Sequence, residues 1–335
     1  MSDRVSKVIL IFRNKKSGFS IHKVFAPLIC RIPQNSLVEV PRFRANIVSM
    51  MVNILYILAS RSKSGINHVT GGAHYLVLGL IGCKTVLTVH DLVLLAHTQN
   101  RIKRVVFKVL WFTIPLKIAT KITCISDKTK TELLANFNIP PSKVCTIYNP
   151  VDDIFHFEAQ KFNAACPRIL HVGTAWNKNL DRVIKALEGV SCVLVIIGQL
   201  DNSLKKMLRE HEIQYESLSE ISDQEMYEEY KKCDIVSFPS IYEGFGMPII
   251  EGQTVGRAVL TSNIEPMTEV GGAAAVYVDP YSVEAIRTGF MSIISDEKLR
   301  EQLIHKGWVN SKRFSPDRIA EQYIKLYESI DENIL

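Results

Sequence analysis

Several features that define whole classes of protein are missing from this sequence. Its seven cysteines are odd in number and scattered, and no two of them have Cys-x-x-Cys spacing. We therefore expect reduced thiols of an intracellular protein, and neither a zinc site nor a disulfide framework. No Gly-x-Gly-x-x-Gly follows either predicted first strand, which weighs against a dinucleotide oxidoreductase. No Asp-x-Asp pair is present either, and we expect no metal ion.

Long apolar runs are also scarce. Val8–Phe12 is too short for the apolar core of a signal peptide, and two lysines follow it closely. The longest run, residues 47–59, is interrupted by Ser49 and Asn53 and falls short of the ~20 residues that a membrane-spanning helix needs. With 47% hydrophobic and 22% charged residues, the chain is predicted to be a globular cytoplasmic protein.

Acidic residues are rare in the first half of the chain only. Residues 1–150 contain 21 lysines and arginines against 5 acidic residues, whereas residues 151–335 contain 19 against 29. The overall net charge of +6 therefore conceals a first half at +16 and a second half at −10. Such asymmetry predicts that the first half faces an anionic partner, either nucleic acid or the anionic leaflet of a membrane. No nucleic-acid motif accompanies the charge, so we expect no nucleic-acid partner.

The periodicity of the chain predicts an α/β protein of about two domains. Apolar strand patterns, separated mostly by helical ones, occur at residues 7–12, 37–40, 66–70, 85–90, 122–126, 144–148, 168–173, 192–198, 234–238 and 276–279. Strands that alternate with helices indicate parallel sheets. Residues 101–121 interleave basic and aromatic side chains. They predict an amphipathic helix that packs on the sheet, with a basic face left for solvent or for anionic lipid.

The most informative stretch is residues 239–251. It follows a predicted buried strand and contains Glu243, two glycines, Pro248 and Glu251. Pro248 is placed to begin a helix, and we expect Glu251 on its first turn. A helix N-terminus at the carboxyl end of a strand attracts anions, and carboxylates beside it can bind sugar hydroxyls. The plainer alternative is an ordinary strand–turn–helix with two capping glutamates.

Glu243 and Glu251 resemble the E-x7-E signature of retaining GT-B glycosyltransferases, in particular the GT4 family. Thr88-Val89-His90-Asp91, Ser126-Asp127 and Asn149-Pro150 match further motifs of the family. The resemblance implies two Rossmann-like domains whose parallel sheets face each other across a cleft, with a C-terminal helix crossing back to the first domain. It places an acceptor domain at residues 1–150, a donor domain at 151–315 and the crossing helix at 316–335.

The resemblance also implies roles for individual residues. Glu251 would bind the ribose of a nucleotide sugar, and Glu243 would hold the sugar together with the backbone of Gly244, Phe245, Gly246 and Met247. His90 would touch the sugar from the first domain.

Three residues would serve the diphosphate. Gly18 would approach it on the loop after the first strand. Lys178, near a helix start, can direct an ammonium group at it. Thr174 stands where many relatives have arginine, and a hydroxyl can donate a hydrogen bond but no charge.

The resulting hypothesis is a metal-independent, retaining hexosyltransferase without cofactor, acting on a glycan or lipid-linked acceptor in bacterial-type surface polysaccharide or lipopolysaccharide synthesis. The basic first half would contact anionic membrane peripherally, at the cytoplasmic face. The alternative is a GT-B partner subunit or sugar-nucleotide-binding protein without turnover, which the Thr174 substitution motivates. A calorimetric screen of nucleotides distinguishes the two.

Overall fold

The computed structural model describes the chain except for residues 1–6, 18–19, 45, 94–104, 106 and 333–335. It divides into two compact units. Unit 1 comprises residues 1–152 and 315–335, and unit 2 comprises residues 153–314. The expected C-terminal helix therefore belongs to unit 1.

Unit 1 is built on a six-stranded, wholly parallel sheet of order β2-β1-β3-β4-β5-β6. Its strands are β1 (Val8–Phe12), β2 (Asn35–Glu39), β3 (Ile66–Val69), β4 (Lys84–Val89), β5 (Lys121–Cys124) and β6 (Val144–Thr146). Every residue of β1 and β3 is buried. Such continuous burial is typical of a parallel sheet covered on both faces.

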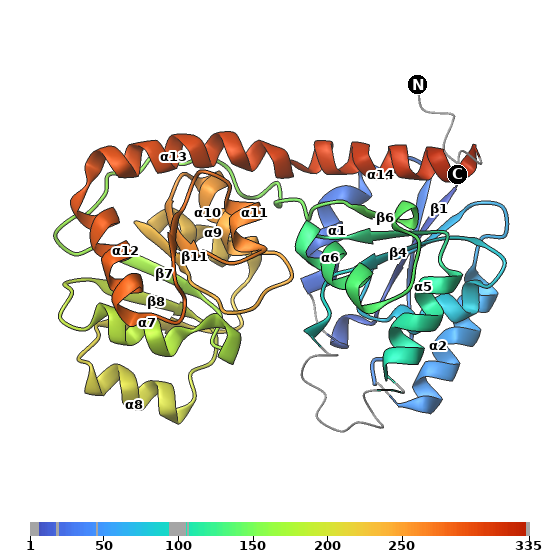
Figure 1. Ribbon diagram of the computed structural model, residues 1–335, viewed down its shortest axis with the longest axis horizontal. Coiled ribbons are helices and arrows are strands. Elements are labelled where there is room, and N and C mark those ends of the chain that lie inside the picture. The colour runs from blue at the N-terminus through green and yellow to red at the C-terminus, as the bar shows by residue number, and fades with distance from the viewer. Residues whose placement is uncertain (1–6, 18–19, 45, 94–104, 106, 333–335) are drawn as a thin grey trace. The chain divides into compact units, whose positions relative to one another are not determined.

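Most helices described in unit 1 connect these strands, and the last one, α14, comes from the C-terminal end of the chain (Figure 1). They are η1 (Lys15–Ser17), α1 (Ser20–Ile29), α2 (Ile47–Ser60), η2 (His74–Leu80), η3 (Lys108–Thr113), α5 (Ile114–Ile118), α6 (Asp127–Asn136), η4 (Pro141–Lys143) and α14 (Pro316–Asp331). The π-helix η3 and α5 cover only part of the helix expected at 101–121, and the residues before 105 lie outside those described. The expectation was wrong at its C-terminal end, where Lys121 begins β5.

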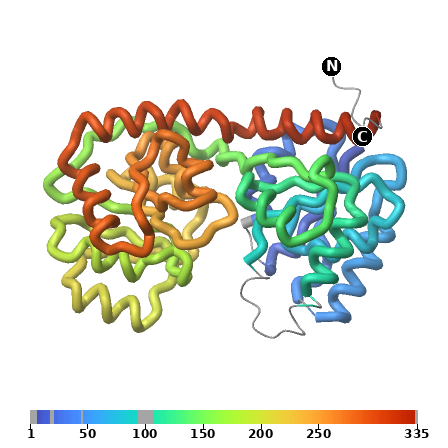
Figure 2. Tube along the Cα trace, in the orientation of Figure 1, coloured from blue at the N-terminus to red at the C-terminus, as the bar shows by residue number. Residues whose placement is uncertain are grey.

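The helix α14 completes unit 1 from the far end of the sequence. Figure 2 shows this red segment running beside the blue N-terminal part of the unit. The Tyr327 hydroxyl and the Nδ1 atom of buried His68 are 2.7 Å apart, and His68 Nε2 lies 2.7 Å from Thr88 Oγ1. At the two ends of α14, Asp317 pairs with Arg31 and Asp331 with Lys84.

Unit 2 repeats the architecture with a parallel sheet of order β12-β11-β10-β7-β8-β9. Its strands are β7 (Arg168–Val172), β8 (Val193–Ile197), β9 (Tyr215–Leu218), β10 (Ile235–Phe238), β11 (Ala258–Ser262) and β12 (Val276–Val278). Its helices are η5 (Trp176–Lys178), α7 (Leu180–Leu187), α8 (Asn202–Glu210), α9 (Asp223–Lys232), α10 (Met247–Val255), α11 (Met267–Gly271), α12 (Val283–Ser295), α13 (Glu297–Ser311) and η6 (Lys312–Phe314).

Alternate residues of the unit 2 strands face different helices. Ile169, Ile235 and Leu260 pack with α7 and α12 in one apolar cluster. On the other side α10 lies so close to β10 that a Cβ on Gly252 would stand 2.8 Å from a methyl of Val236. The helix α10 thus lies directly against the sheet of unit 2 (Figure 1), and the candidate site includes its N-terminus.

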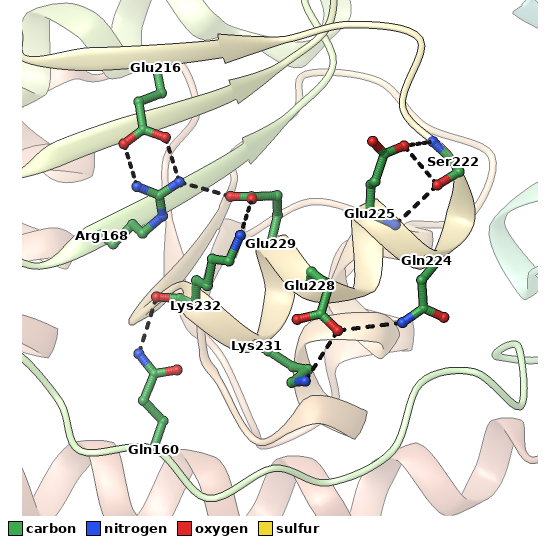
Figure 3. A network of polar contacts seen from close by, with 10 residues as sticks. All are labelled: Gln160, Arg168, Glu216, Ser222, Gln224, Glu225, Glu228, Glu229, Lys231 and Lys232. Carbon is green, nitrogen blue, oxygen red and sulfur yellow. Dashed lines mark hydrogen bonds and ion pairs between the residues drawn. The ribbon is translucent and has the colours of Figure 1, made fainter.

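A polar network anchors α9 to the sheet of unit 2 (Figure 3). Arg168, at the start of β7, donates two hydrogen bonds of 2.6 and 2.7 Å to Glu216 on β9 and one of 2.8 Å to Glu229 on α9. These charge-assisted bonds lower the pKa of Glu216. At the other end of α9, Ser222 and Glu225 form a capping box. The Arg168 contacts therefore tie the C-terminal part of α9 to the sheet, and the capping box stabilises its N-terminus.

Two further predictions concern cysteines and the membrane. All seven cysteines are free. In the part of the chain that the structure describes, no helix is both long and apolar enough to cross a bilayer.

Candidate functional site

The strand order of unit 2 creates a natural binding position. Its first strand, β7, lies between β8 and β10, so the connections leave β7 and β10 on opposite sides of the sheet. Ligands of open α/β sheets bind at such a switch point, beyond the carboxyl ends of the strands. Thr174 and Lys178 follow β7, and Glu243 to Met247 follow β10. The sequence therefore brings these predicted residues to one edge of the sheet.

The loop after β7 is shaped by two residues in left-handed conformations. Gly173 has φ +99°, and a Cβ there would stand 2.8 Å from Cγ of Lys178. Asn179 has φ +64° and is buried, and its amide donates to the carbonyls of Pro239 and Pro280 at 2.9 and 2.7 Å. Gly173 thus makes room for the Lys178 stem, and Asn179 ties the loop to the one after β10.

Lys178 and Glu243 form the centre of the site. The ammonium group donates to Glu243 Oε1 at 2.7 Å and lies 4.8 Å from the ring centroid of Phe238. The Asn177 amide also donates to Glu243 Oε1, at 3.2 Å. Both charged side chains are largely shielded, with 21% and 14% of their surfaces exposed. An ammonium group has three N–H donors, so this pairing still lets Lys178 donate to a phosphate oxygen.

Thr174 lies in the same loop as Lys178 but contacts a different part of unit 2. Its hydroxyl donates to the carbonyl of Gln199 at 2.8 Å. Gly198, with φ +141°, leaves the space that the Thr174 methyl occupies, since a Cβ there would lie 2.9 Å from it. The Thr174 hydroxyl therefore links the loop after β7 to the loop after β8. The positive charge that contacts Glu243 comes from Lys178.

The N-terminus of α10 faces the same edge of the sheet. Gly246 is the N-cap residue with φ +131°, Met247 begins the helix, and Pro248 occupies its first turn as expected. Phe245 is buried edge-on against Phe314, 5.7 Å between ring centroids. Gly244 lies in the bend between Glu243 and Phe245. Free N–H groups and the helix dipole make this terminus favourable for phosphate.

Glu251 lies deeper than expected. It is the fifth residue of α10, so the prediction that it occupies the first turn was wrong. Its Oε2 accepts a hydrogen bond of 2.6 Å from Tyr230 on α9. Burial and the neighbouring carboxylate raise the pKa of Tyr230 well above its ordinary value, so the phenol remains a donor. Tyr230 therefore fixes one carboxylate oxygen of Glu251.

Beneath the site, β7 carries a histidine that stays neutral. Burial, together with the charge of Lys178, lowers the pKa of His171 to about 3. His171 Nδ1 lies 3.2 Å from Ser237 Oγ on β10. Because the imidazole of His171 is neutral, the positive charge at the carboxyl end of β7 comes from Lys178.

His90 lies in unit 1, directly after β4. Its Nε2 is 2.8 Å from the carbonyl oxygen of Thr70, and a Cβ on Gly71 would stand 2.4 Å from the ring. Burial lowers its pKa, while the carbonyl of Thr70 and the charge of Asp91 oppose the shift. The glycine and the carbonyl hold the ring at the carboxyl edge of the unit 1 sheet. Gly18, the other residue predicted in this half, lies outside the described residues.

Sequence reasoning gave no role to Tyr230, Asn177 or Gly173. Asn177 and Gly173 belong to the loop that was singled out for Lys178, so proximity in sequence could have found them. Tyr230 contacts Glu251 from a different helix, and no local sequence pattern predicts that contact. Among the described residues, no group of three or more His, Cys, Asp or Glu side chains is arranged to hold a metal ion.

Two Rossmann-like units with parallel six-stranded sheets define the GT-B fold, and solved structures show the same architecture. The chain superposes on sucrose-phosphate synthase from Thermosynechococcus elongatus with a TM-score of 0.80, covering 98% of this chain and 100% of that one at 15% identity. At this identity the likeness concerns the fold alone.

Sequence comparison identifies the family. Residues 152–308 match the model for glycosyl transferases group 1, and residues 23–154 match glycosyltransferase family 4. The two models meet at the junction of the two structural units. The chain is therefore a GT4-type glycosyltransferase of the GT-B fold.

Two curated relatives carry more specific names. O-antigen chain mannosyltransferase B of Escherichia coli is 27% identical over 73% of this chain and 70% of its own length. O-antigen chain mannosyltransferase RfbU of Salmonella typhimurium is 30% identical over 58% of this chain and 56% of its own length. The chain thus spans little more than half of the second relative.

Proposed function

We propose that this protein transfers a hexose from a nucleotide sugar to a glycan or lipid-linked acceptor, with retention of anomeric configuration, in surface polysaccharide synthesis. The observation that carries the proposal is the placement of Lys178, Glu243, the α10 N-terminus and Glu251 around the switch point of unit 2. The names of the two relatives favour mannose over glucose as the hexose.

Each group has a distinct task in the proposed reaction. Glu251, oriented by Tyr230, accepts hydrogen bonds from the ribose hydroxyls. Lys178 and the N–H groups at the start of α10 stabilise the charge that develops on the leaving diphosphate, which makes a metal ion unnecessary. Glu243 and the backbone of residues 245–247 bind the sugar hydroxyls. Glu243 is assigned to positioning, because its carboxylate is already paired with Lys178.

Retention is proposed to follow from attack on the same face of the sugar as the departing phosphate. The acceptor hydroxyl then approaches beside the leaving group, and a phosphate oxygen takes its proton. In this scheme His90 touches the sugar, and the basic charge of residues 1–150 suits an anionic or lipid-linked acceptor at the cytoplasmic face of a membrane.

Calorimetric titration with GDP, UDP, dTDP and ADP tests the proposal. We expect one nucleotide to bind, and Glu251→Ala to weaken that binding by about 100-fold, since two hydrogen bonds to a charged group are lost. Glu297→Ala is the matched control, because this glutamate is exposed in the first turn of α13 and is not among the residues assigned to the site. If no nucleotide binds, or if Glu251→Ala binds like the wild type, the assigned donor site is wrong. The protein would then be better described as a partner subunit without turnover.

A further inference from the structure

Helix α2 differs from an ordinary surface helix because it is apolar on its outward side as well as on its inward side, where Met50, Ile54 and Ile57 pack on the core. The residues that it turns inward include Ser49 and Asn53, both buried, and Asn53 donates to Tyr75 at 2.9 Å and to the carbonyl of Arg42 at 3.0 Å. Of the apolar residues in the helix, only Ile57 is fully buried. A helix on the surface of a globular protein normally turns its apolar side inward.

The outward side of α2 is almost entirely apolar. Its large exposed side chains recur at helical spacing and have exposed fractions between 42% and 77%: Ile47, Val48, Met51, Leu55, Tyr56 and Leu58. We call Ile47, Val48, Met51, Leu55 and Leu58 the α2 stripe. The helix contains no charged residue at all. Figure 1 shows α2 at the periphery of unit 1. Contiguous exposed apolar surface of this kind marks an interaction site.

The charged residues in the segment that contains the stripe are all basic. Between Glu39 and Asp91 the sequence contains no acidic residue. Arg42 and Arg44 precede the helix, and both line a hollow of about 470 Å³ together with Asn46 and Val48 at its N-terminus. The hollow therefore combines two guanidinium groups with the positive end of a helix dipole, which suits a phosphate group.

We propose that α2 lies flat in the interface of an anionic lipid bilayer, with the α2 stripe among the acyl chains and Arg42 and Arg44 on headgroup phosphates. A lipid surface supplies a partner for each part of this face, acyl chains for the α2 stripe and negatively charged headgroups for the arginines. A second copy of the chain would match the stripe but would offer the arginines no acidic partners from the same segment.

This placement concerns a different helix from the one predicted at residues 101–121, whose apolar residues were expected to pack on the sheet. In the described part of residues 101–121, Phe112 is buried and Trp111 packs on Tyr75, 4.9 Å between ring centroids. Those aromatic residues thus belong to the core of unit 1. The inference deepens the proposed action at the membrane, but its test requires neither donor binding nor sugar transfer.

Sedimentation with lipid vesicles tests the proposal on the full chain. We expect the wild type to bind vesicles of phosphatidylcholine mixed with phosphatidylglycerol, and to bind pure phosphatidylcholine more weakly. The double variant Met51→Glu/Leu55→Glu should bind the anionic vesicles about 100-fold more weakly, because two apolar insertions are lost. Arg42→Gln/Arg44→Gln should lose the preference for anionic lipid and keep the weaker binding to neutral lipid.

The control is a double variant of exposed apolar residues in unit 2, Met291→Glu/Val309→Glu. It should bind lipid like the wild type. Thermal unfolding and nucleotide titration of every variant show whether the fold and the donor site are intact. The proposal is overturned if the wild type ignores anionic vesicles or if both double glutamate variants bind alike. It is equally overturned if sedimentation velocity shows a wild-type dimer that only the α2 variant dissociates, because the stripe would then join two copies.

Discussion

At the scale of single residues, unit 2 presents opposite charges in a fixed arrangement. Lys178 and Glu243 restrain each other, and the amide of Asn177 also holds Glu243. Glu251 is restrained separately by Tyr230. Side chains held in this way lose little further freedom when a ligand binds, which favours affinity.

The role given to Tyr230 predicts the effect of Tyr230→Phe. The variant keeps the buried ring and removes only the donor to Glu251, so the carboxylate loses its fixed orientation. We expect nucleotide affinity to fall by about tenfold, the equivalent of about 1.4 kcal/mol. Titration calorimetry measures the change.

Tyr227→Phe is the matched control on the same helix. The Tyr227 hydroxyl contacts His156 and Glu158 instead of Glu251. Both variants remove one hydroxyl from α9, and only Tyr230→Phe should weaken nucleotide binding. Equal effects on affinity would assign Tyr230 to the stability of the helix and not to the site.

These residues also show how far the sequence alone could go. Glu243 and Lys178 were found because each lies in a short local motif after a strand. Tyr230 and Glu251 are 21 residues apart on separate helices, and their contact depends on how α9 and α10 pack. The depth of Glu251 was misjudged for a related reason, since a motif fixes spacing along the chain and not the exact start of a helix.

At the scale of elements, Arg257 joins the ends of two helices. Its buried guanidinium donates to the carbonyls of Tyr230 and Lys231 at the end of α9, and of Val255 and Gly256 at the end of α10, at 2.8 to 3.1 Å. Helix C-termini leave carbonyls without intrahelical partners, and a cation there is favourable. Arg257 thus fixes α10 relative to the helix that carries Tyr230.

We expect Arg257→Met to lower the free energy of unfolding by about 3 kcal/mol, because several buried carbonyls lose their donors at once. Chemical denaturation measures this change. Arg287→Met is the comparison. Arg287 donates to the carbonyls of Ala186, in the last turn of α7, and of Glu188, just after it, but is only partly buried, so water can replace it and about 1 kcal/mol is expected. Equal losses would show that burial does not decide the contribution.

The strands were easier to predict from sequence than these helix contacts. Ten of the twelve strands lie within a few residues of the bounds expected for them, because most are short apolar runs between turns. The strands β9 and β11 were not predicted, and β9 is polar and mostly exposed. For residues 101–121 the sequence predicted an apolar side that packs on the sheet, and the packing of Phe112 and Trp111 in unit 1 agrees with that prediction. The exposure of the outward apolar side of α2 has no signature in periodicity, since an apolar stripe looks the same whichever way it faces.

At the scale of the whole molecule, the two units differ in how many buried histidines they contain. Burial lowers the pKa of His68 to about 3 and of His74 to about 4 in unit 1, and lowers that of His90 as well. In unit 2, the pKa of His171 is lowered to about 3. His68 also joins α14 to the sheet through Tyr327. The stability of unit 1 therefore depends more strongly on keeping imidazoles neutral.

The sign of the resulting pH dependence follows from these shifts. An unfolded histidine takes up a proton near pH 6.5, whereas the folded state resists protonation down to about 3 or 4. Stability is therefore present above pH 6.5 and lost as the pH falls toward 4, by about 1.4 kcal/mol per pH unit for each such histidine.

Scanning calorimetry from pH 7 to about 4.5 should show a steeper loss for unit 1 than for unit 2. His68→Gln should make the unit 1 dependence shallower, whatever it does to stability at pH 7. The exposed His305 is the control, and His305→Gln should leave both slopes unchanged. If His68→Gln and the wild type lose stability at the same rate, then His68 is not held neutral, and its contact with Tyr327 has to be reassigned to a charged imidazole.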